Sequence, residues 1–196
     1  GEALPMAVAV AVAVASPATD ADPTGTFYWS AAGVPARVKG AFYRLDADKD
    51  GRVTREELME GFAREFWSAA AAAGGVPLEN IAADTSPPRM SPYAASTLDG
   101  LFEQVSIGDL RFGGRYVDNR RFAMLYAEAL FMRFADGGDS LDDAQAQQAL
   151  QFLTPRPKDG GPKPAVHFAA PPGAYTESGE LQLPKAWFMM LLRTMA

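Results

Sequence analysis

Five carboxylates lie within twelve positions of the chain, in the segment LDADKDGRVTREEL at residues 45–58. Three of them are aspartates at alternate positions, and a single glycine follows the third. Short carboxylates spaced in this way can converge on one cation in a tight loop. Without a cation their charges repel one another, so the loop is costly to fold unless a positive charge neutralises it. The alternative interpretation is an acidic surface turn between two helices.

With Asp46 as the first position, this segment resembles the calcium-binding loop of the EF-hand superfamily. The resemblance implies a metal site formed by Asp46, Asp48, Asp50, the Arg52 carbonyl, Thr54 and Glu57. Gly51 permits the positive φ that the sharp turn requires. Glu57 would supply both carboxylate oxygens, which favours Ca²⁺, with Mg²⁺ as a weaker competitor. In the family, the residue at the eighth position, here Val53, forms a short β-bridge with a neighbouring loop.

EF-hands usually occur in pairs, so further loops of this kind are expected. Three segments keep parts of the pattern without its ligands, at residues 110–121, 134–145 and 174–185. They end in Arg121, Gln145 and Lys185, where the pattern requires glutamate. The sequence therefore predicts an all-α fold of helix-loop-helix units in two lobes, with one intact hand at 46–57. The alternative is one true hand on an otherwise unrelated helical domain.

Helices must position these loops, and their expected bounds follow from apolar spacing and capping residues. One helix is predicted from Pro35 to Leu45, and a second from Thr54 to a stop at Gly74. Further helices are predicted after Ser91, at 118–134, from a capping box at Ser140 to Leu153, and at 183–195. The last one is so apolar that the rest of the domain or another chain must cover it.

The chain is expected to have four regions. They are an N-terminal arm at 1–33, the intact hand at 34–75, a helical region at 76–153, and a Pro/Gly-rich connection with the apolar C-terminal helix at 154–196. Ala and Val alternate from residue 7 to 15, so this run has two apolar faces and is expected to lie against another surface. The apolar run at 4–15 is shorter than the roughly 20 residues of a membrane-spanning helix, so no transmembrane span is expected.

Composition excludes several classes of function. The formal net charge of -6 argues against nucleic-acid binding, which normally needs a basic surface. The absence of cysteine excludes disulfides and thiolate metal sites. The single histidine, His167, lacks hydrolase-like neighbours, and no phosphate-binding loop or nucleophile elbow is present. No enzymatic activity is therefore expected.

The sequence thus predicts a calcium-binding, non-catalytic protein that serves as a structural or regulatory subunit of a larger assembly. The Ala/Val run and the apolar C-terminal helix are the expected contacts with other protein subunits. The alternative is a soluble calmodulin-like Ca²⁺ sensor, in which cation binding opens a helix pair to receive a target helix. The absent cysteine, the initial glycine and the Ala-rich start favour an organelle, expected to be the mitochondrion, with the cytoplasm as the alternative.

Overall fold

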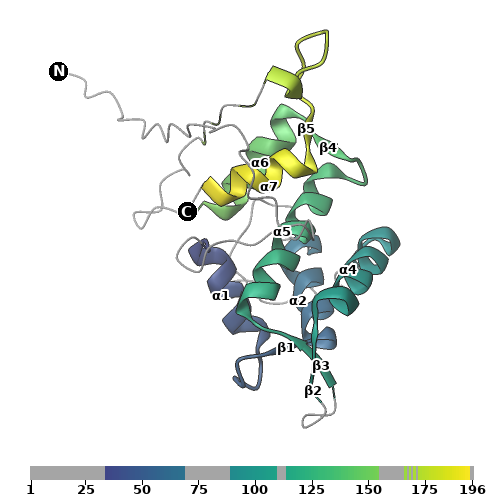
Figure 1. Cartoon of the computed structure of the whole chain (residues 1–196), viewed down its shortest axis with the longest axis vertical. Coiled ribbons are helices and arrows are strands. Elements are labelled where there is room, and N and C mark those ends of the chain that lie inside the picture. The colour runs from purple at the N-terminus through teal and green to yellow at the C-terminus, as the bar shows by residue number, and fades with distance from the viewer. Residues whose placement is uncertain are drawn as a thin grey trace, which may run out of the picture.

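The computed structural model describes residues 34–68, 89–109, 114–154 and 172–194, together with 166, 168 and 170. This part of the chain contains six α-helices and two small antiparallel sheets (Figure 1). Several predicted features lie outside the described residues, among them the arm at 1–33, the helix stop at Gly74, the domain boundary at 75, and His167. No helix within the described ranges has the length and apolar character needed to cross a membrane.

Helices α1 (Ala36–Leu45) and α2 (Arg55–Trp67) flank the acidic loop, with the short strand β1 (Val53–Thr54) between the loop and α2. The buried residues of α1 recur at helical spacing and are Val38, Ala41, Phe42 and Leu45. Helix α2 ends at Trp67 and does not continue to Gly74, because Ser68 already has extended backbone angles.

Helix α4 (Pro92–Val105) begins after Ser91, whose hydroxyl accepts a hydrogen bond from the Ala94 N–H, so the predicted cap is confirmed. Strands β2 (Ile107–Asp109) and β3 (Gly114–Val117) then lead into helix α5 (Asn119–Ala135). The first sheet has the order β1-β3-β2. It therefore joins the acidic loop to the connection between α4 and α5.

The second sheet consists of strands β4 (Ser140–Leu141) and β5 (Leu183–Pro184), which pair antiparallel. Helix α6 (Asp143–Leu153) follows β4, and a 3₁₀ turn (Pro172–Ala174) precedes β5, which is followed by helix α7 (Lys185–Thr194). The predicted cap at Ser140 is wrong, because Ser140 belongs to β4. The capping box of α6 is formed by Asp142 and Gln145 instead.

Helix α5 lies at the centre of the molecule and packs against α1, α2, α4, α6 and α7 (Figure 1). Most of its circumference is apolar and buried, as expected for a helix that is covered on all sides. One continuous hydrophobic core extends from α1 to α7. The two sheets therefore belong to one packed unit, and α5 serves as a helix of both predicted lobes.

Helix α7 is covered by this same core. Phe188 and Leu192 are fully buried, and Met189 and Leu191 are nearly so. Phe188 lies against Phe131 of α5, with ring centroids 5.8 Å apart. The apolar character of the C-terminal helix is thus explained within the chain and does not by itself require another subunit.

The all-α prediction is correct for the helical majority of the described chain and omits the two sheets. In each sheet, backbone N–H and C=O groups of one connecting segment pair with those of another. Each strand has only two to four residues.

Candidate metal centre

Asp46, Asp48 and Asp50 lie together in the loop between α1 and α2. One carboxylate oxygen from each lies within 4.8 Å of the others. In the part of the chain that the structure describes, no other three acidic side chains gather closely enough to share a metal ion. Asp46 is buried, whereas Asp48 and Asp50 are exposed to solvent. The group could therefore receive a cation from the solvent side.

The loop backbone folds around these carboxylates. Asp46 Oδ1 accepts a hydrogen bond from the Asp50 N–H at 3.0 Å, and Asp46 Oδ2 accepts one from the Gly51 N–H at 3.0 Å. Asp48 Oδ1 accepts from the Asp50 N–H at 3.2 Å, and Asp50 Oδ1 accepts from the Arg52 N–H at 2.9 Å. A carboxylate has about four acceptor positions, so each group keeps lone pairs that could bind a cation.

Two residues of the loop have left-handed backbone angles, Lys49 with φ 60° and Gly51 with φ 80°. A Cβ at Gly51 would meet no atom within 4 Å, so glycine is favoured there by the backbone angle and not by a lack of space. The positive φ expected at this turn is confirmed.

Glu57 closes the loop in a different way. Its Oε1 accepts a hydrogen bond from the Ala47 N–H at 3.2 Å, and its Oε2 accepts from the Thr54 N–H and the Thr54 hydroxyl, each at 2.9 Å. Thr54 and Glu57 form the capping box of α2. Glu57 thus connects the beginning and the end of the loop but does not belong to the aspartate group. To bind the same cation its carboxylate would have to move toward the aspartates.

The other predicted ligand, Arg52, carries its side chain toward the first sheet. Its guanidinium carbon lies 4.6 Å from the ring centroid of Tyr116 in β3, in a cation–π arrangement. The structure thus brings three of the six predicted ligands together, and places Thr54 and Glu57 beside them in a capping pair.

The N-terminus of α2 is also fixed to α4. Arg55 forms an ion pair and hydrogen bond with Asp99. The hydrogen bond from Arg55 lowers the pKa of Asp99 below its ordinary value and, reciprocally, raises the pKa of Arg55. Both groups are exposed, so this contact positions the helix and contributes little to stability.

The partner of the acidic loop is the described part, residues 114–121, of the segment at 110–121. Val53 lies opposite Val117, and Thr54 lies opposite Tyr116. Val53 and Val117 are each the eighth residue of their twelve-residue segment, so the β-bridge expected for Val53 is present. Asp118 follows β3 and caps α5 by accepting from the Arg121 N–H at 2.9 Å. Its carboxylate also pairs with the Arg121 guanidinium at 2.7 Å, so this acidic group is already engaged.

The segments at 134–145 and 174–185 meet in the second sheet, but the register of the latter differs from the prediction. Leu141 and Leu181 are the eighth residues of these two segments and would be expected to pair, but Leu141 lies opposite Leu183, two residues further on. Leu181 instead bridges Tyr175 within a local hairpin. Backbone hydrogen bonds close this hairpin, including one from Thr176 N–H to Glu180 O at 2.8 Å.

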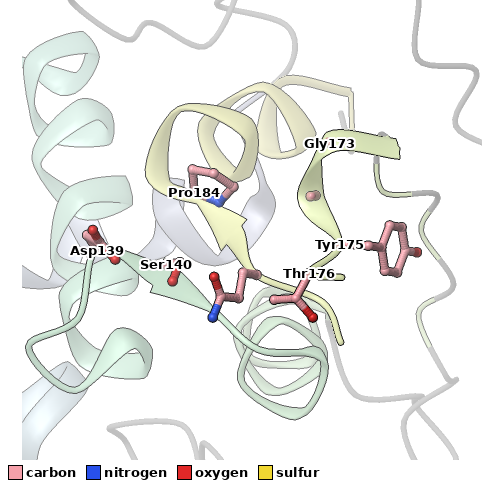
Figure 2. A pocket seen from close by; sticks show the side chains of 8 residues that line it. Asp139, Ser140, Gly173, Tyr175, Thr176 and Pro184 are labelled. Atoms are coloured by element: carbon pink, nitrogen blue, oxygen red, sulfur yellow. The ribbon is translucent and has the colours of Figure 1, made fainter. Parts of the chain in front are cut away.

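A cleft of 250 Å³ lies beside the second sheet. Figure 2 shows Asp139 and Ser140 on one side of it and Gly173, Tyr175 and Thr176 on the other. Asp139 is the single charged side chain among its lining residues. This cleft therefore lacks the set of carboxylates that the loop at 46–57 has.

One charged group in the core was not recognised from the sequence, namely Glu65 of α2. It is 3% exposed and accepts hydrogen bonds from Arg37 and Tyr126. A signal was present, since Glu65 follows Leu58 and Phe62 at seven and three residues and so continues the apolar stripe of α2.

Comparison with protein-family models, with curated proteins and with solved structures finds no match to this chain. The aspartate group and the pairing of the loops are therefore the observations that bear on the class of protein.

Proposed function

We propose that the chain is a calcium-binding protein of the EF-hand type, with one competent loop at residues 46–57. The observation that carries this proposal is the group of Asp46, Asp48 and Asp50, with carboxylate oxygens within 4.8 Å of one another. Such a group of hard oxygen ligands suits Ca²⁺ or Mg²⁺. The pairing of Val53 with Val117 supports the assignment, because EF-hand loops pair through their eighth residues.

In this proposal the three aspartates each give one oxygen, the Arg52 carbonyl gives another, and Thr54 contributes its hydroxyl or a bridging water. Glu57 leaves the Ala47 and Thr54 N–H groups and gives both oxygens to the cation. A hydrogen bond to a charged group contributes about 1.5–3 kcal/mol, and the cation must offset those that Glu57 gives up. A bidentate glutamate favours Ca²⁺, because Mg²⁺ needs a stricter octahedral geometry.

The protein's role is proposed to be non-catalytic, as a structural or regulatory subunit of a larger protein assembly. With one competent loop, pairs of hands cannot bind cations cooperatively, so a structural or graded response is favoured over a steep switch. The support for partner subunits is the Ala/Val run near the N-terminus of the sequence. The apolar helix α7 no longer supports them, because its own chain covers it. A mitochondrial location belongs to the same proposal.

Calorimetric Ca²⁺ titration tests the metal site. Wild type is expected to bind one Ca²⁺ per chain, and Glu57→Gln to bind at least about tenfold more weakly, a difference of about 1.4 kcal/mol. Glutamine also serves at this position of a capping box, so the substitution removes the charge while keeping the cap. The control is Asp136→Asn, which also neutralises one carboxylate but lies in the segment at 134–145, next to the second sheet. This variant should bind Ca²⁺ like wild type. Equal Ca²⁺ binding by wild type and Glu57→Gln, or no Ca²⁺ binding by wild type, would contradict the proposal.

The sensor alternative makes a different prediction. A sensor exposes an apolar groove when it binds Ca²⁺, so the fluorescence of a hydrophobic dye should rise strongly. A structural subunit should show no such rise. Potassium chloride at the same ionic strength is the control for a general effect of salt.

A further inference from the structure

Glu65 is a buried carboxylate with several hydrogen-bond donors. Its side chain is 1% exposed. Its Oε1 accepts from Arg37 Nε at 3.0 Å and from the Tyr126 hydroxyl at 2.8 Å, while Arg44 lies 3.6 Å from Oε2. Burying a carboxylate is unfavourable unless it is paired and hydrogen-bonded, and these contacts meet that requirement.

Tyr126 is suited to be a permanent donor in this group. Its burial, and then the charge of Glu65, raise the pKa of Tyr126 well above its ordinary value. The hydroxyl therefore keeps its proton at neutral pH and donates to Glu65. Because Tyr126 belongs to α5, the group is also fixed to the central helix of the core.

The two ion-paired residues lie at corresponding ends of the helices that flank the acidic loop. Arg37 is in the first turn of α1 and Glu65 is in the last turn of α2, so both are at the ends remote from the loop. The Arg37 guanidinium also stacks on Phe152 of α6, with its carbon 3.7 Å from the ring centroid. The contact therefore holds together the ends that would separate if the helix pair opened.

A glycine in α1 makes room for the second arginine. Arg37, Gly40 and Arg44 are spaced three and four residues apart, and so lie on one face of the helix. A Cβ on Gly40 would lie 3.1 Å from an Arg44 guanidinium nitrogen. Glycine is unfavourable inside a helix, and here it lets Arg44 reach back over α1 toward Glu65.

The same two helices also touch near the loop. A Cβ on Gly61 of α2 would lie 2.2 Å from Cγ of Leu45, the last residue of α1. The helices thus approach as closely as a glycine permits near the loop. The Arg37–Glu65 ion pair joins their loop-remote ends, and Arg44 reaches Glu65 from the last turn of α1.

We propose that Glu65, with Arg37, Arg44 and Tyr126, forms a clamp that keeps α1 and α2 closed, so that a cation in the loop orders the loop without opening the helices. The part concerning the cation rests on the proposed function. The clamp itself is a property of the protein without metal, and can be tested separately.

Two spin labels can report on the clamp directly. The chain has no cysteine, so Ala36→Cys and Arg64→Cys provide the two labelling sites, both exposed and near the loop-remote ends of α1 and α2. Pulsed electron paramagnetic resonance then measures the distance distribution between the labels. Without metal, a narrow distribution is expected, and adding Glu65→Gln should shift it to longer and broader distances.

The matched control is Glu56→Gln, which makes the same chemical change on α2 at a side chain that is 80% exposed. It should leave the distribution unchanged. An unchanged distribution in the folded Glu65→Gln protein would overturn the clamp. If circular dichroism shows that Glu65→Gln does not fold, Arg37→Met is measured in its place, with the same shift expected and the same result overturning the proposal.

The effect of Ca²⁺ on the clamp is measured with the same spin-labelled proteins. Added Ca²⁺ should leave the distances unchanged when Glu65 is present and lengthen them in Glu65→Gln. Equal lengthening in both proteins, or lengthening in neither, would overturn the part of the proposal that concerns opening. Calorimetry on these samples measures Ca²⁺ binding independently. If no Ca²⁺ binds, the proposed function fails, while the measurement without metal still decides on the clamp.

Discussion

Val53 lies directly opposite Val117, and both side chains are fully buried. This pair joins the acidic loop to the segment before α5, although the two residues are far apart in the chain. Arg52 and Tyr116 stack beside it. The shape of the acidic loop therefore depends on packing against a second loop as well as on any cation.

Val117→Ala should lower the free energy of unfolding by about 2 kcal/mol, because it leaves a cavity beneath the sheet. The control is Val105→Ala, the same change at a partly buried position of α4, with an expected loss below about 1 kcal/mol. Urea unfolding at a fixed Ca²⁺ concentration measures both. Equal losses would mean that the valine pair has no special part in holding the loop.

Removal of Ca²⁺ should destabilise the folded protein. A ligand at one hundred times its dissociation constant stabilises the state that binds it by about 2.7 kcal/mol. A chelator should therefore lower the melting temperature of wild type and have little effect on Glu57→Gln. A melting temperature that does not respond to Ca²⁺ or chelator in wild type would argue against a site in the loop.

Glu65→Gln should lower the free energy of unfolding by about 3 kcal/mol, because it leaves Arg37 and Arg44 without their buried counter-charge. Glu60→Gln is the control on the same helix. Its ion pair with Arg64 is solvent-exposed, so a change below about 0.5 kcal/mol is expected. Denaturant titration distinguishes the two. Similar small losses would show that the buried group contributes no more than a surface pair.

The sequence predicts the acidic loop well because its information is local. The aspartates and Gly51 lie within six positions, and the cap at Ser91 is next to the helix that it begins. Thr54 and Glu57 were predicted as metal ligands, and their capping pair was not predicted.

Backbone pairing between distant loops depends on residues far apart in the chain, so a short sequence pattern does not predict it. Ser140 and Asp142 are both suitable caps by residue type. Gln145 favours Asp142 as its capping-box partner, and the pairing of Ser140 with Pro184 in β4 and β5 keeps Ser140 out of the helix.

The burial of Glu65 is likewise a long-range property. Its donors Arg37 and Tyr126 are 28 and 61 residues away in the chain. The sequence shows a glutamate in an apolar stripe, but it does not show that donors from two other helices converge on it. The register of the segment at 174–185 was wrong for a related reason, since a hairpin between Tyr175 and Leu181 displaces the strand to Leu183.

The stability of the fold should fall at high pH because of Tyr126. Its folded-state pKa is raised above the ordinary value of 10.0, so the folded state holds this proton more tightly than the unfolded state does. The corresponding stability is fully present below about pH 10 and is lost as the pH rises through the folded pKa. Urea unfolding between pH 8 and about 11 should show this loss in wild type.

Tyr126→Phe should reduce this dependence on pH and lower the stability at neutral pH by about 1–2 kcal/mol, because Glu65 loses a donor. Tyr43→Phe, at a side chain that is 68% exposed, is the control and should keep the wild-type dependence. The same pH dependence in wild type and Tyr126→Phe would contradict the assignment.

Gly61→Ala should destabilise the protein, although alanine favours a helix over glycine by about 1 kcal/mol. The added Cβ overlaps the Leu45 side chain, so α1 and α2 must move apart or Leu45 must leave its rotamer. Such overpacking costs about 1–3 kcal/mol. Gly100→Ala in α4 is the matched control, because its Cβ meets no atom within 4 Å, and a gain of about 0.5–1 kcal/mol is expected.

The double variant Gly61→Ala with Leu45→Ala separates the clash from other effects. Leu45→Ala alone removes buried apolar surface and should destabilise the protein. If the close approach of the two helices is the cause, the double variant should lose less stability than the sum of the two single losses. Strictly additive losses, or a gain for Gly61→Ala equal to that for Gly100→Ala, would show that α1 and α2 are free to separate at this point.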